Sequence, residues 1–166
     1  MNSRVDPGTE DAGPILLAIL ENTSTKSPRV HFNGHYDVVP AGSGWEYTPF
    51  KLTKVSSNLI GRGTADMKGG IATILGVLQQ FLGQRRLRKG TVSLSIVPDE
   101  ERGGRLGTGY LVERLPSPPD IVFTPEPSMP YLITVTVGSY SGWSKSKVSR
   151  RMLRYPVRAS MHFCRG

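Results

Sequence analysis

Acidic and histidine side chains recur in four separate stretches of this sequence, and their types are those that bind metal ions. The six residues are His35, Asp37, Asp66, Glu100, Glu101 and Glu126. His35 and Asp37 stand two residues apart, and a carboxylate beside an imidazole commonly fixes the ring orientation and tautomer of a metal ligand. One imidazole with five carboxylates and no thiolate suits zinc, cobalt or manganese.

Each stretch also has a simpler interpretation when it is taken alone. Most His and Asp residues in loops bind nothing, and Asp66 can be a carboxylate at a helix N-terminus. Glu100 and Glu101, which follow Asp99, can form a solvated turn. The metal-site hypothesis therefore depends on whether the fold brings these stretches together.

Hydrophobic periodicity predicts the elements that would position these side chains. Strands are predicted over 15–20, from residue 29, and over 91–97, 120–124 and 131–137, with helices over 71–82 and 110–115. The strand from residue 29 follows a Ser- and Thr-rich turn and is expected to form a hairpin with the first. This order predicts an α/β fold with a largely parallel mixed sheet flanked by helices. The acidic residues and His35 follow strands or precede a helix, so the carboxyl edge of the sheet should gather them.

Composition limits the class of protein. The single cysteine excludes an internal disulfide, and neither a membrane span nor a signal peptide is visible, so a cytoplasmic protein is expected. Most of the net charge of +8 lies in the 28 residues after Gly138, which carry seven Lys and Arg residues and no acid. Residues 1–13 are polar and are interpreted as a loose lead-in.

Four blocks resemble the M20 family of metal-dependent hydrolases, which includes acetylornithine deacetylase, succinyl-diaminopimelate desuccinylase, aminoacylase and glutamate carboxypeptidase. They are Gly-His-Tyr-Asp-Val-Val-Pro at 34–40, Gly-Arg-Gly-Thr-Ala-Asp-Met-Lys-Gly-Gly at 61–70, Pro-Asp-Glu-Glu at 98–101 and Pro-Glu-Pro at 125–127. The resemblance covers residues 14–138, and it implies a partial zinc-peptidase-like catalytic domain.

The resemblance implies a role for each candidate residue. His35 and Glu126 bind one of two divalent metal ions, Glu101 binds the other, and Asp66 bridges both. Asp37 orients His35, and Glu100 is the general base that moves protons between a metal-bridging water and the leaving nitrogen. The implied substrate is an N-acyl amino acid or a small peptide.

Residues 139–166 depart from the family pattern where an inserted ferredoxin-like lid domain is expected to begin. Arg158-Ala159-Ser160 stands where the lid's His-Ala-Ser is expected, and the sequence offers no distal histidine for the second metal. The chain is therefore expected to be a fragment with weak or no activity. A family-type homodimer is expected only if the lid is present.

Two other interpretations remain open. The basic tail, with Tyr140, Trp143 and Tyr155 interleaved, is compatible with nucleic-acid binding. Alternatively, the chain is an inactive remnant that keeps the motifs alone. Salt-dependent binding to random DNA would favour the first, and metal-dependent amide hydrolysis would favour the hydrolase.

Overall fold

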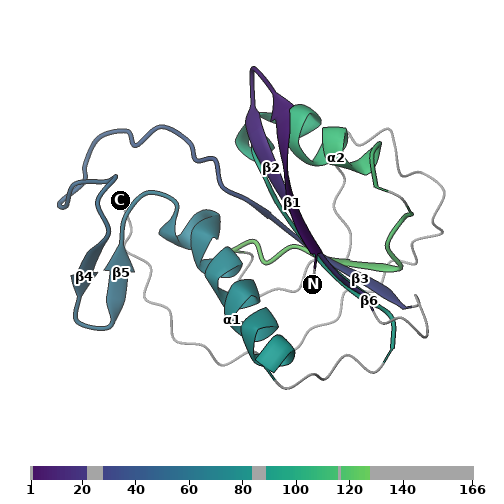
Figure 1. Ribbon diagram of the computed structural model, residues 1–166. Helices are drawn as coiled ribbons and strands as arrows, with labels where there is room; N and C mark the ends of the chain where they lie inside the picture. The colour runs from purple at the N-terminus through teal and green to yellow at the C-terminus, as the bar shows by residue number, and fades with distance from the viewer. Residues whose placement is uncertain (1, 22–27, 84–88, 116, 128–166) are drawn as a thin grey trace, which may run out of the picture. The chain divides into compact units, whose positions relative to one another are not determined.

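A five-stranded sheet organises the computed structural model, which describes residues 2–21, 28–83, 89–115 and 117–127 (Figure 1). The strands are β1 (Asn2–Thr9), β2 (Gly13–Glu21), β3 (Arg29–His35), β6 (Thr91–Val97) and β7 (Ile121–Phe123), in the order β1-β2-β6-β3-β7. β6 pairs antiparallel with β2 and parallel with β3, and β3 also pairs parallel with β7. The predicted α/β class and the mixed sheet are confirmed.

Two predictions for the N-terminal part are wrong. Residues 1–13 are not a loose lead-in, because β1 pairs antiparallel with β2, with a register irregularity between Asp6 and Thr9. The strand was not predicted because its sequence is polar. An edge strand buries few side chains, and Val5 remains 67% exposed. The expected hairpin between β2 and β3 does not form, because β6 lies between them.

Helix α1 (Gly69–Gly83) covers one face of the sheet and confirms the predicted apolar helix. Its buried residues Ile74 and Leu78 pack with Leu94 of β6, and Phe32 of β3 packs against this cluster. The approach is close, since a Cβ added to Gly34 would lie 2.8 Å from Ile71 Cγ1. Leu75 and Leu82, which the helical pattern also assigned to the core, are 45% and 38% exposed.

The opposite face carries the short helix α2 (Tyr110–Val112), on the other side of the sheet in Figure 1. Ile15 and Leu17 of β2, Val97 of β6 and Leu111 form its apolar cluster. This arrangement agrees with strand alternation, which places odd-numbered residues of β2 and β6 on one face. The predicted short helix therefore exists, although it spans fewer residues than expected.

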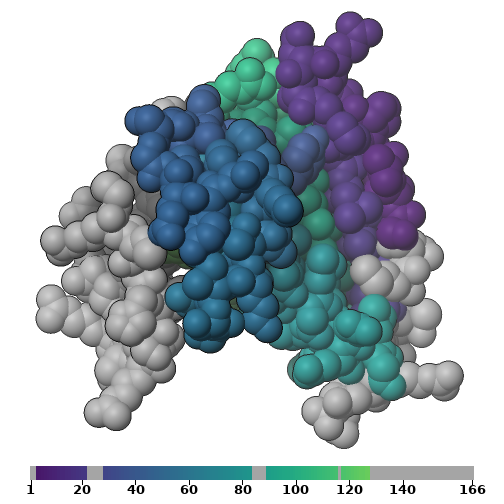
Figure 2. Space-filling view, turned by 90° about the vertical axis from the view of Figure 1, so that its left-hand side faces the viewer, coloured from purple at the N-terminus to yellow at the C-terminus, as the bar shows by residue number. Residues whose placement is uncertain are grey.

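A long loop and a small hairpin lie between β3 and α1. Residues 40–49 form no helix or strand, and the hairpin of β4 (Thr53–Val55) and β5 (Asn58–Ile60) was not predicted. Arg62, which follows β5, binds the loop. Its Nη2 donates to Ala41 O at 3.0 Å, and its guanidinium lies 5.2 Å from the Trp45 ring centroid. Figure 2 shows this blue segment on the near surface.

Two predictions concern residues that the structure does not describe. The strand over 131–137 and the basic tail over 139–166 both lie outside the described residues. Within the described ranges, no helix has the length and apolar character needed to span a bilayer.

Candidate metal centre

His35 is the buried centre of the candidate site. It is the last residue of β3 and is 1% exposed. Its Nδ1 lies 3.3 Å from Asp37 Oδ1 and 3.1 Å from Asp37 O, while its backbone N–H donates to Met67 Sδ at 3.2 Å. Because Nδ1 is occupied in this way, Nε2 is the nitrogen that faces the other candidate residues.

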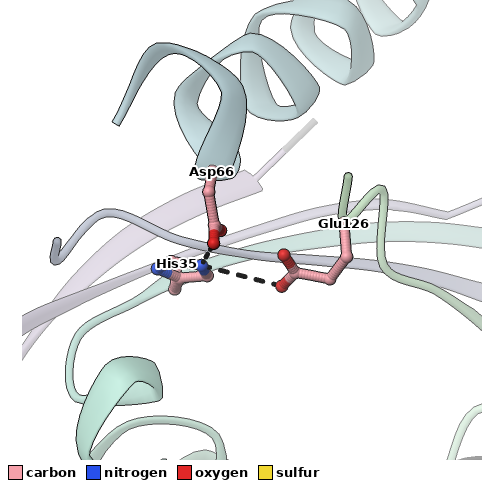
Figure 3. Close-up of side chains that lie close together, drawn as sticks. All are labelled: His35, Asp66 and Glu126. Carbon is pink, nitrogen blue, oxygen red and sulfur yellow. Dashed lines mark hydrogen bonds and ion pairs between the residues drawn. The ribbon is translucent and has the colours of Figure 1, made fainter. Parts of the chain in front are cut away.

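Two carboxylates converge on that nitrogen (Figure 3). Asp66 Oδ1 lies 3.0 Å and Glu126 Oε1 lies 3.6 Å from His35 Nε2. One donor atom from each of the three residues lies within 4.8 Å of the others. Asp66 is 50% exposed and Glu126 is 34% exposed, so the group is buried at His35 and open to solvent at the carboxylates.

The irregular turn Thr64–Lys68, which precedes α1, carries Asp66. Gly63 begins this turn with a φ of 82°, and a Cβ there would lie 2.6 Å from Val38 Cγ1, so only glycine fits. Lys68 Nζ donates to Tyr36 O at 2.8 Å and fastens the turn to the segment after β3. These contacts hold Asp66 beside His35, and they give the glycine and the lysine structural roles.

Asp37 joins His35 to the two adjacent glutamates. Its Oδ1 accepts the N–H of Glu100 at 3.2 Å, and its Oδ2 accepts the N–H of Glu101 at 3.2 Å. The side chain of Glu100 returns toward the site, with its Oε2 3.8 Å from His35 Nε2. A single carboxylate therefore contacts both the His35 ring and the backbone of the glutamate pair.

Glu126 follows β7 and is positioned with help from the start of α1. Pro125 packs so closely on Gly70 that a Cβ on that glycine would lie 2.6 Å from Pro125 O. β7 itself is set against β3 by Asp120, whose carboxylate accepts from the Arg29 backbone N–H at 2.7 Å and pairs with its guanidinium at 3.1 Å. The helix and β3 thus both contribute to the placement of Glu126.

The concentration of carboxylates changes the proton affinities at the site. Burial alone would lower the pKa of His35, but the hydrogen bond to Asp66 and the charges of Glu126 and Glu100 outweigh it and raise that pKa. Burial raises the pKa of Glu126 to about 7, opposed by His35 and reinforced by Asp66. Burial also raises the pKa of Glu100, opposed by His35 and reinforced by neighbouring carboxylates. The site therefore carries excess negative potential, which favours a cation.

Four of the five predicted acidic residues lie within ion-pairing distance of the His35 ring, namely Asp37, Asp66, Glu100 and Glu126. Glu101 reaches the group through its backbone N–H, which donates to Asp37 Oδ2, whereas the Glu100 carboxylate also faces the His35 ring. The role of Glu101 at a second metal remains a prediction. Met67 was missed as a supporting residue, and its signal in the sequence is a large apolar side chain within an otherwise polar block.

The family of the chain follows from comparison with known proteins. The model of peptidase family M20/M25/M40 matches residues 31–163, and the chain belongs to this family. A succinyl-diaminopimelate desuccinylase of Gluconobacter oxydans is 42% identical over 106 residues, which cover 62% of this chain and 28% of that protein. The corresponding enzyme of Zymomonas mobilis is 34% identical over 140 residues, covering 80% of this chain and 36% of that protein. The chain thus spans well under half the length of these relatives.

Solved structures agree with this assignment. Human carnosine dipeptidase 1 matches with a TM-score of 0.58 and 30% identity, over 74% of this chain and 29% of that one. An M20 family metallo-carboxypeptidase from Sulfolobus solfataricus has a TM-score of 0.61 at 23% identity, over 73% of this chain and 28% of that one. The second likeness shows the fold alone, and both support the α/β fold with a mixed sheet.

Proposed function

We propose that this chain carries the metal-holding part of an amide hydrolase, whose substrate is an N-acyl amino acid or a small peptide. The observation that carries the proposal is the convergence of His35, Asp66 and Glu126 within 4.8 Å, with the Glu100 carboxylate beside them. Family membership supports metal-dependent amide hydrolysis as the reaction class. The names of the relatives, a desuccinylase and a dipeptidase, support the substrate class.

The residues present fit a divalent cation. One imidazole nitrogen and two carboxylate oxygens form a donor set that zinc accepts, with cobalt or manganese as alternatives. The raised pKa of Glu126 reflects burial and crowding with Asp66, and a cation between the carboxylates would relieve that crowding. His35, Asp66 and Glu126 are therefore the proposed ligands of a first ion. Glu101, with Asp66 shared, is the proposed ligand of a second.

Glu100 is the proposed proton carrier. A bound divalent ion would make water more acidic and stabilise negative charge on the amide oxygen. Glu100 would accept the proton of the attacking water at a carboxylate oxygen and return it to the leaving nitrogen as the C–N bond breaks. Its raised pKa brings this carboxylate closer to the pH at which such an exchange is efficient.

Cobalt binding to the full chain tests the proposed ligands directly. We expect Asp66→Ala to weaken Co²⁺ binding in calorimetry by more than the roughly 10–100-fold that loss of a mere supporting partner costs. Glu113→Ala is the matched control, because Glu113 is a 78% exposed acid of equal charge that pairs with Arg114. Equal affinities in the two variants would remove Asp66 from the ligand set.

A further inference from the structure

A column of polar side chains lies along β3 and β6, and the proposed chemistry does not use it. His31, Asn33 and His35 share one face of β3, because alternate residues of a strand point the same way. His31 is 5% exposed, with Nδ1 2.7 Å from Ser93 Oγ and Nε2 2.9 Å from Ser95 Oγ. Both ring nitrogens are therefore satisfied by hydroxyl groups, and neither faces the candidate metal site.

The hydrogen bonds of this column run in one direction. The Ser95 hydroxyl donates to Asn33 Oδ1 at 2.7 Å, so its oxygen must accept from His31 Nε2–H. In a neutral imidazole the other nitrogen is then an acceptor, and the Ser93 hydroxyl donates to it. The amide orientation of Asn33 follows, and its Nδ2 donates to Thr108 Oγ1 at 3.3 Å. The column thus ends on a residue outside the sheet.

Thr108 belongs to the turn Arg105–Gly109, which is joined to the turn that carries the glutamate pair. The carboxylate of Asp99 accepts the Leu106 N–H at 2.9 Å, and the Asp99 carbonyl accepts the Gly104 N–H at 2.6 Å. Gly107 lies against the strand end, since a Cβ there would clash with the Pro98 carbonyl oxygen. The two turns therefore form one packed unit over 98–109.

We propose that the hydrogen-bonded column from Ser93 to Thr108 is a positioning device, which holds the Glu100–Glu101 turn in place beside His35. Asn33 and Asp37 stand two residues before and after His35, and each binds the 98–109 unit from its own side. The 98–109 unit is therefore bound to the chain on both sides of His35. The importance of this placement for proton transfer by Glu100 rests on the proposed function. Asn33 and Thr108 are positioning residues, since the structure shows neither in contact with the metal-site group.

Hydrogen exchange in the metal-free full chain tests this device without any catalytic assay. Thr108→Val keeps the shape of the side chain and removes the hydroxyl acceptor, whereas Thr108→Ser keeps the hydroxyl. We expect Thr108→Val to raise amide exchange at Glu100 and Glu101 about tenfold, the factor that corresponds to one lost hydrogen bond. Thr108→Ser should stay within about twofold of the wild type, and Leu94 in the sheet core should not change in either variant.

A second variant acts further up the column. Ser95→Ala removes the donor that orients the Asn33 amide, and it should raise exchange at Glu100 and Glu101 while the Asp99–Leu106 bond stays intact. The proposal is overturned if the valine and serine variants of Thr108 exchange alike at the two glutamates. It is also overturned if Leu94 accelerates by the same factor, because the column would then be merely structural. Neither outcome bears on Co²⁺ binding by Asp66, so the two proposals fail separately.

Discussion

His31 should make the stability of this chain sensitive to acid in a defined pH range. Its burial lowers the pKa of His31 from 6.5 to about 4. Because the folded-state pKa lies below the unfolded one, the unfolded chain binds more protons between these values. The stabilising contribution is therefore complete above pH 6.5 and is lost as the pH falls toward 4. Integrated between pH 7 and pH 4.5, the loss is about 2 kcal/mol, because each tenfold change in proton affinity corresponds to about 1.4 kcal/mol.

Urea unfolding in the presence of a chelator measures this loss, with His31→Gln as the comparison. Other groups, including His35, titrate in both proteins, so the difference between wild type and variant isolates His31. We expect the wild type to lose roughly 2 kcal/mol more than the variant between pH 7 and pH 4.5. Parallel pH profiles, within about 0.5 kcal/mol, would show that His31 is not held neutral in the folded chain.

Two further changes test other parts of the site. In a chain that turns over an amide substrate, Glu100→Gln should retain metal and lower turnover by roughly 10²–10⁴-fold, as measured by metal analysis and steady-state kinetics. Loss of metal instead would assign Glu100 as a ligand. Gly70→Ala should weaken Co²⁺ binding, because its Cβ would displace Pro125 and with it Glu126. The control Gly76→Ala has open space around its Cβ and should raise the free energy of unfolding by up to about 1 kcal/mol without changing metal affinity. Equal metal affinities in the two alanine variants would contradict the account of Glu126.

The sequence was most informative where a strand ends in a charged residue. His35 ends β3, the Glu100–Glu101 pair closely follows β6, and Glu126 closely follows β7. Parallel strands present their carboxyl ends at one edge, so the local pattern was enough to predict that these residues meet. Asp66 required the additional signal of a glycine-rich block before an apolar helix.

The features that the sequence did not reveal are those that depend on which strands pair in the sheet. The apolar run of β2 fits an interior strand, but its periodicity does not say that β6, from the far side of α1, pairs with it. The same limit hid the partners of His31, because Ser93 and Ser95 reach it only through the parallel register of β3 and β6. The pattern within one strand says which residues share a face, but it does not say which distant strand becomes the partner.

The parallel pairing of β3 has a consequence for the order in which the chain folds. β1 and β2 form a local hairpin, whereas β3 must pair with strands that follow far later in the sequence, β6 and then β7. Bringing residues together from distant parts of the sequence costs loop-closure entropy before any stabilising contact forms, so such pairings form late. During synthesis, an emerging chain holds His35, Asp37 and Asp66 well before Glu126 leaves the ribosome. The proposed ligand set would therefore be complete only when β7 has joined the sheet, and a cation bound earlier would have to exchange its ligands as folding ends.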